Sequence, residues 1–175
     1  MSSEAAAPGS GPESRPGKST SLTHVDETGA ARMVDVTAKP VSARTARATG
    51  FVETSAAVVD LLRGEGVPKG DALSVARIAG IMGAKKTSEL VPLCHPIAIS
   101  GVKVSLAVED AGVAISAEVK TADRTGVEME ALTAVAVAGL TVIDMVKAVD
   151  PAARLTAVQV ESKGGGVSGD WVRRT

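Results

Sequence analysis

The fold of this chain is decided by residues 125–150, TGVEMEALTAVAVAGLTVIDMVKAVD, which predict one long helix. Thr125 followed three residues later by Glu128 matches a capping box, and the proline after Asp150 is expected to end the helix there. Residues 131–143 carry no charge, and this run is shorter than the ~20 apolar residues that a membrane span needs. The stretch therefore indicates a helix buried in a core or an interface, with charges only near its ends.

Four ionisable residues lie near the ends of this helix, Glu128 and Glu130 at its start and Asp144 and Lys147 at its finish. Asp144 and Lys147 are three residues apart and share a helix face, so they can form an ordinary surface ion pair or a proton-handling pair. At ~1.5 Å of rise per residue, Glu130 and Asp144 lie about 21 Å apart. One straight helix cannot bring both to one reacting centre, so a site that uses both must be shared between subunits.

Composition limits the classes of protein that the chain can belong to. It has 175 residues and a formal net charge of −1, and its only aromatic residues are Phe51 and Trp171. The charge and the lack of stacking side chains argue against nucleic-acid binding. The single cysteine, Cys94, excludes an intrachain disulfide framework, and His24 is the only histidine besides His95, so a zinc site is not expected.

Residues 1–20 are rich in Pro, Gly, Ser and Ala, which predicts a disordered tail, and residues 21–175 are expected to form one domain. No apolar stretch near the start resembles a signal peptide, so we expect a soluble cytoplasmic protein.

Apolar periodicity predicts the order β–α–α–β–β–α–β for the domain. The expected elements are a strand at 42–52, a helix capped by Thr54 or Ser55 that stops at Gly64, a helix through 73–90 after a turn at 68–71, a hairpin with strands 102–108 and 113–119, the long helix, and a strand at 155–161. This order predicts an α+β two-layer sandwich, with a ferredoxin-like antiparallel sheet covered by helices and one added helix. Oligomerisation is expected to cover the second face of the sheet.

Two groups of residues outside the long helix have alternative interpretations. His95, between two prolines and beside Cys94, is either a hydrogen-bonded loop histidine or a catalytic acid/base. Basic residues recur at turns and element ends, where they either form a solvated face or bind a phosphate chain next to the glycines at 164–166. These basic residues are Arg44, Lys69, Lys85, Lys86, Lys147 and Lys163.

Several runs of the chain closely resemble one family, the cyclic pyranopterin monophosphate synthases (molybdenum cofactor biosynthesis protein C). They are LTHVDETGAARMVDVTAKPV at 22–41, KGDALSVARIAGIMGAKKTSELVPLCHP at 69–96, RTGVEMEALTAV at 124–135, DMVKAVD at 144–150 and SGDW at 168–171. The resemblance covers essentially all of the chain from Leu22 to Trp171, and the LCHP and GVEMEALTA runs together are specific to the family.

The resemblance implies a phosphorus–oxygen lyase of molybdenum cofactor (molybdopterin) biosynthesis. Its substrate would be (8S)-3′,8-cyclo-7,8-dihydroguanosine 5′-triphosphate, and its products cyclic pyranopterin monophosphate and pyrophosphate. It also implies a homohexamer, a trimer of dimers, with active sites at the dimer interface. No cofactor is firmly implied, although Mg²⁺ can accompany the triphosphate.

The family's functional positions can be carried over residue by residue. Asp144 matches the catalytic aspartate and Lys147 the lysine beside it. The substrate-binding segments match Leu93-Cys94-His95 and Met129-Glu130. Further active-site positions match Arg44, Lys69, Lys85, Glu128 and Lys163.

Two departures from the family pattern are visible. Val167 stands where the glycine-rich loop commonly has lysine. The run Val142-Ile143-Asp144-Met145-Val146-Lys147 has Ile and Val where tyrosine and cysteine are usual. The alternative to the lyase is a non-catalytic nucleotide- or pterin-binding oligomer of the same fold. Val167 is the only feature in its favour.

Overall fold

The computed structural model describes residues 23–64 and 69–174, and the predicted disordered tail at 1–20 lies outside this range. The chain divides into an N-terminal unit that ends at Arg32 and a larger unit that begins at Met33. In the described part of the first unit, the Asp26 carboxylate accepts the backbone N–H groups of Thr28 and Ala30, both at 2.9 Å. All that follows concerns the larger unit.

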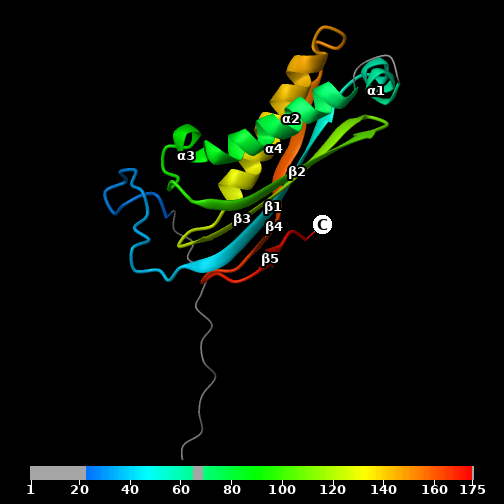
Figure 1. Cartoon of the computed structure of the whole chain (residues 1–175). Helices are drawn as coiled ribbons and strands as arrows, with labels where there is room; N and C mark the ends of the chain where they lie inside the picture. The colour runs from blue at the N-terminus through cyan, green and yellow to red at the C-terminus, as the bar shows by residue number, and fades with distance from the viewer. Residues whose placement is uncertain (1–22, 65–68, 175) are drawn as a thin grey trace, which may run out of the picture. The chain divides into compact units, whose positions relative to one another are not determined.

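The larger unit contains nine helices and strands within the described residues (Figure 1). In chain order they are β1 (Ser42–Glu53), α1 (Ala56–Arg63), α2 (Lys69–Lys85), α3 (Thr87–Leu90), β2 (Ile99–Glu109), β3 (Gly112–Asp123), α4 (Glu128–Val146), β4 (Arg154–Gly164) and β5 (Trp171–Val172).

The strands form one antiparallel sheet in the order β2-β3-β1-β4-β5, with β1 in its centre. The predicted hairpin is confirmed, since Val104 of β2 faces Ala117 of β3 and Leu106 faces Ile115. The predicted α+β sandwich is confirmed as well, because α2 and α4 cover one face of this sheet (Figure 1). On the helical side the core consists almost entirely of alanine and valine.

Small residues bring the layers of the core close together. Ala46 and Ala48 of β1 and Ala134 and Ala138 of α4 are at most 1% exposed. A Cβ atom on Gly80 of α2 would lie 2.8 Å from the Ala134 carbonyl oxygen, so only glycine permits this approach of α2 to α4. Burial of α4 is therefore achieved by close packing rather than by large side chains.

Helix α4 is the predicted long helix, but its ends differ from the prediction. Its N-cap is Val127, without a side-chain hydrogen bond, so the predicted capping box of Thr125 is wrong. The N-cap lies two residues later than expected, so Glu128 is the first helical residue. The helix ends at Val146 rather than at Asp150, since the N–H groups of Val149 and Asp150 both turn back to the Val146 carbonyl, at 2.9 and 3.0 Å.

Helix α4 is also the only described helix long and apolar enough to cross a membrane, with a mean hydropathy of 1.7 over its most apolar window. Its inner residues, including Ala131, Val135 and Val142, are fully buried against the sheet and α2. The helix is thus the centre of a protein core, as its uncharged run predicts.

Three further boundaries differ from the prediction. The helix expected through 73–90 begins at Lys69 and is split into α2 and α3 by Lys86, whose φ and ψ of −107° and 9° are not helical. Strand β4 extends to Gly164, which places Lys163 in the sheet. The short strand β5, in the loop before the C-terminus, was not predicted because two residues are too few to show a periodic pattern.

Candidate active site

The start of α4 carries an ion pair that joins the helix to the sheet. Lys163 Nζ of β4 lies 2.9 Å from Glu128 Oε1, and the two side chains are only 33% and 23% exposed. Lys163 is paired in register with Ala46, so its side chain points to the helical side of the sheet, as the buried Ala46 does. The structure thus brings two predicted site residues into direct contact.

Glu130, the third residue of α4, is a buried acid. It is 3% exposed, and its Oε2 accepts no hydrogen bond from any described residue. Burial, with a smaller contribution from the negative charge of Glu128, raises the pKa of Glu130 to about 6. A carboxyl group in this state can hold or release a proton near neutral pH, and it can accept donors from a ligand.

Arg44 of β1 places a positively charged side chain against the glycine-rich loop that follows Lys163. Its Nε donates to the carbonyl of Asp123 at 2.9 Å, whereas its buried Nη2 has no acceptor among the described residues. Gly166, with φ of +73°, lies against this guanidinium, and a Cβ atom on Gly166 would collide with Nη1. The glycine-rich loop is therefore folded directly onto Arg44, which only a residue without a side chain allows.

Two polar residues of this region were not predicted as site residues. Asp170 closes the glycine-rich loop, because its Oδ1 accepts the Gly165 N–H at 3.0 Å. The buried Oγ of Ser42 has no partner among the described residues. An Asp in a glycine-rich segment is a recognisable turn signal, whereas nothing in the sequence marks Ser42, since its burial results from pairing with Asp123 across the sheet.

The predicted substrate-binding loop at 93–95 is held in place by backbone contacts. Cys94 N–H donates to the Val91 carbonyl at 3.0 Å, and His95 Nε2 lies 2.8 Å from the Val34 carbonyl oxygen. Because a carbonyl can only accept, His95 carries a proton on Nε2. Burial, and then the negative charge of Glu130, raises the pKa of the Cys94 thiol.

Asp144 and Lys147 lie at the other end of α4. Lys147 Nζ is 2.6 Å from Asp144 Oδ1, and the side chains are 65% and 68% exposed. The helix is continuous from Glu128 to Val146, so its length separates this pair from Glu130 by about 21 Å. The structure confirms that the two ions pair, and it shows that within one subunit they do not meet the cluster at the start of α4.

The remaining predicted residues are spread around these two regions. Met129 is 39% exposed beside the buried Glu130, and Leu93 is half-buried. Lys85 is exposed at the last residue of α2. Lys69 begins α2, sixteen residues before Lys85, and its side chain lies outside the described atoms. At ~1.5 Å per residue these two lysines are roughly 24 Å apart, so they too cannot serve one centre within one subunit.

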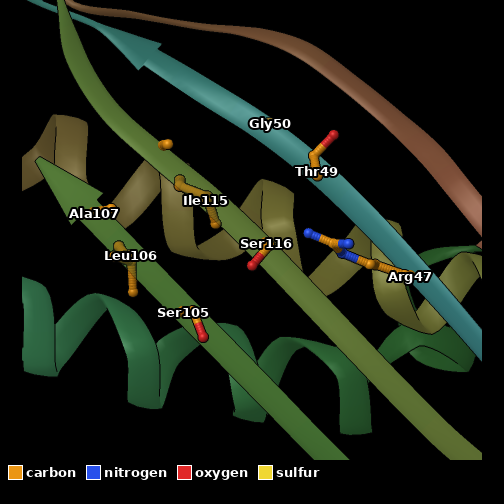
Figure 2. Close-up of a pocket in the computed structure, with 9 residues that line it drawn as sticks. Arg47, Thr49, Gly50, Ser105, Leu106, Ala107, Ile115 and Ser116 are labelled. Carbon is orange, nitrogen blue, oxygen red and sulfur yellow. The ribbon is translucent and has the colours of Figure 1, made fainter. Parts of the chain in front are cut away.

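A hollow of about 270 Å³ lies elsewhere, on the outer face of the sheet (Figure 2). Figure 2 shows Arg47, Thr49, Ser105 and Ser116 along its strands, with helices behind the sheet. None of the predicted site residues lines it. This hollow is therefore separate from the candidate site.

Metal binding has no preformed site in the described part of the chain. Among these residues, no three His, Cys, Asp or Glu side chains are grouped so that they could hold a metal ion. That Mg²⁺ can accompany the triphosphate stays a prediction.

The fold and the site define the class of protein, a ferredoxin-like α+β sandwich whose polar residues lie at both ends of its core helix. Residues 33–166 match the model of the MoaC family, and the chain belongs to that family. The predicted family is thereby confirmed.

Curated relatives match nearly the whole chain. It is 71% identical over 152 residues to a cyclic pyranopterin monophosphate synthase of Streptomyces avermitilis, a match that covers 87% of this chain and 89% of the relative. A relative of the same name from a Nocardioides species is 70% identical over 155 residues, with 87% and 95% covered. The Mycobacterium tuberculosis protein called cyclic pyranopterin monophosphate synthase 2 is 55% identical over 157 residues, with 90% and 94% covered.

Proposed function

We propose that this chain is a lyase that converts (8S)-3′,8-cyclo-7,8-dihydroguanosine 5′-triphosphate into cyclic pyranopterin monophosphate and pyrophosphate, in molybdenum cofactor biosynthesis. The observation that carries the proposal is the 71% identity to a cyclic pyranopterin monophosphate synthase over 89% of that relative's length. The site supports it, because the acids, the cations and the Asp144–Lys147 pair are the groups that such a reaction needs.

Proton transfer is assigned to the pair at the end of α4. Rearrangement of a fused, guanine-derived ring moves protons between nitrogen and oxygen atoms, which requires acid and base groups. Asp144 and Lys147, 2.6 Å apart, form an ion pair that the substrate is proposed to separate.

Ring and phosphate recognition is assigned to the cluster at the start of α4. The unpartnered Oε2 of Glu130 can accept donors from the edge of the ring, next to the loop that carries Cys94 and His95. Arg44, with a free Nη2, and Lys163 supply positive charge. Attack of a ribose-derived oxygen on the α-phosphorus expels pyrophosphate, so such charge stabilises the leaving group. Lys69 and Lys85 are assigned the same role, and any Mg²⁺ is proposed to arrive with the triphosphate.

The assay is pyrophosphate release from the cyclised guanosine triphosphate. Wild type is expected to turn the substrate over, and Asp144→Asn is expected to bind it without turnover. If wild type binds the substrate and releases no pyrophosphate, the chain is the alternative, a non-catalytic nucleotide- or pterin-binding oligomer.

Assembly into a homohexamer, a trimer of dimers with shared sites, is part of the proposal. Three apolar residues with helical spacing are exposed on α2, Val75, Ile78 and Met82, at 44%, 58% and 54%, and Leu140 on α4 is 60% exposed. An apolar helical face of this kind is typical of an interface. Within one subunit, α4 is too long for the Asp144–Lys147 pair to reach Glu130. A second copy bound at this face would place its Asp144–Lys147 pair next to the first subunit's Glu130.

Mixed oligomers test this arrangement. Glu130→Ala and Asp144→Ala subunits are each expected to be inactive, and mixing them is expected to restore part of the activity because some sites then receive both intact residues. Light scattering gives the oligomer mass, and exchange of tagged subunits is the control. Mixed oligomers without recovered activity, once exchange is demonstrated, contradict the shared site. The same proposal places the protein in solution in the cytoplasm, without nucleic acid or membrane partners.

A further inference from the structure

Asp150 makes more hydrogen bonds than its predicted role as a helix end requires. Its Oδ2 accepts the Thr54 hydroxyl at 2.8 Å and the Ser55 backbone N–H at 2.7 Å. Its Oδ1 accepts the Ala152 N–H at 3.0 Å. These bonds lower the pKa of Asp150, with the Thr54 hydroxyl as the largest cause, so the carboxylate is charged at neutral pH.

These bonds connect three separate parts of the fold. Thr54 and Ser55 link the end of β1 to the start of α1, where Ser55 is the N-cap and provides no side-chain cap of its own. Asp150 belongs to the turn after α4, and Ala152 lies in the connection to β4. One half-buried carboxylate therefore ties the C-terminal end of α4 to the central strand of the sheet.

The catalytic pair depends on this end of the helix. Lys147 is the C-cap of α4, and its N–H donates to the Ile143 carbonyl at 2.9 Å. The Asp150 N–H returns to the Val146 carbonyl at 3.0 Å, which directly links the anchored turn to the residue before Lys147. In the part of the chain that the structure describes, the Asp144 and Lys147 side chains bond only to each other. Their position is thus set by the backbone of the last turn.

We infer that Asp150 is a positioning residue for the Asp144–Lys147 pair, because it fixes the last turn of α4 to the Thr54–Ser55 corner. The inference rests on the proposed function for its catalytic consequence. Asp150 touches no reacting atom in it and acts only through the placement of Lys147. Without the hydrogen bonds of Asp150, the Asp144–Lys147 pair becomes more mobile relative to the bound ring, and proton transfer slows. The ring- and phosphate-binding residues at the other end of α4 stay unchanged.

The test compares Asp150→Ala, Asp150→Asn and Thr54→Val with wild type in the oligomeric enzyme. Asp150→Ala is expected to lower kcat about tenfold and to change KM less than about twofold, a milder effect than the ~100-fold cost of a 1 Å misplacement. Asp150→Asn keeps an oxygen that can accept from Thr54 and Ser55, so it should recover most of kcat. Thr54→Val removes one bond and should lose about twofold to threefold, on the scale of one hydrogen bond's net contribution.

Asp110→Ala is the matched control. It removes the 2.8 Å ion pair between Asp110 and Arg63 and so loosens the other end of α1 without touching α4. Its kcat should equal that of wild type. An Asp150→Ala enzyme with wild-type kcat, or a loss that Asp110→Ala reproduces, overturns the inference.

Hydrogen exchange separates this inference from the proposed function. Amides of residues 147–150 should exchange faster in Asp150→Ala than in wild type, and close to the wild-type rate in Asp150→Asn and in Asp110→Ala. If wild type releases no pyrophosphate, the proposed function fails, while the exchange rates still decide whether Asp150 holds the turn. Unchanged exchange in Asp150→Ala overturns the inference even if activity falls.

Discussion

The two ends of α4 present their charged residues in opposite ways. At the start, Glu128 reaches across to Lys163 of β4 and Glu130 is 3% exposed. At the finish, Asp144 and Lys147 pair with each other on the same helix and are two-thirds exposed. The first end is a partly buried cluster of polar side chains within one subunit. The second is an exposed ion pair on one helix, which is shielded from water only when a ligand or another subunit covers it.

The largest expected effect comes from the exposed end. Asp144→Asn should lower kcat by about 100- to 10,000-fold, the usual contribution of general acid–base catalysis. Its free energy of unfolding should stay within about 0.5 kcal/mol of wild type, as for most surface substitutions. Pyrophosphate release and urea denaturation measure the two quantities. The control is Glu118→Gln, which breaks the exposed Glu118–Lys120 pair on the outer face of the sheet, 2.9 Å long, and should retain full activity. A large loss of stability in Asp144→Asn would erase the contrast between the ends.

Glu130→Gln, unlike Asp144→Asn, should raise the free energy of unfolding above pH 7. The folded-state pKa of Glu130 is raised from its ordinary 4.5 to about 6, so the folded protein binds this proton more readily than the unfolded chain. The stability from this group is fully present below pH 4.5 and is lost as pH rises through 6.

At about 1.36 kcal/mol per pKa unit, the loss is about 2 kcal/mol at neutral pH. Glu130→Gln should therefore raise the free energy of unfolding above pH 7 by up to that amount, and remove its pH dependence between 4.5 and 6. Activity should fall at the same time. Urea denaturation at pH 5 and pH 8 checks the sign. A variant that is less stable than wild type at pH 8 shows that Glu130 is partnered in the assembled protein.

Breaking the Glu128–Lys163 pair should have a smaller effect. Glu128→Gln and Lys163→Met should each raise KM more than they lower kcat, because these residues are assigned to binding. A double-mutant cycle on the free energy of unfolding should give a coupling of about 1 kcal/mol, at the upper end of values for partly exposed pairs. The same cycle on Asp144 and Lys147 should give a smaller coupling, since that pair is more exposed. Equal couplings would contradict the difference between the two ends.

The smallest expected effect concerns the glycine-rich loop. Val167 is 81% exposed, where the family commonly has lysine. Val167→Lys should lower KM by about twofold to threefold, because an exposed charge contributes about 0.2–1 kcal/mol. Val167→Gln, which adds a polar side chain without charge, is the matched control. A lower KM in both variants would show that the charge is not the cause.

Local patterns were sufficient for most elements of the fold. Alternating apolar residues predict the hairpin, and its pairing of Val104 with Ala117 agrees. The uncharged run 131–143 predicts the core helix. The predicted boundaries of α1 are confirmed, since Ser55 is its N-cap and Gly64 its C-cap, whereas the boundary predicted at Thr125 is wrong, and neither Thr125 nor Ser55 makes a side-chain cap. The Ser55 N–H bonds instead to Asp150, 95 residues away, a partner that no local pattern reveals.

The sequence by itself determined the family, the core helix and the identity of the ionisable residues, because these depend on residue types and short spacings. Only the tertiary structure decided the state of each charge. Glu128 and Glu130 are two residues apart, yet one is ion-paired with Lys163, whereas the buried Oε2 of the other has no hydrogen-bond partner among the described residues. That difference arises because β4 passes beside one side chain while the core surrounds the other. The pKa of an ionisable group depends on neighbouring charges, hydrogen bonds and burial, not on its position in the chain.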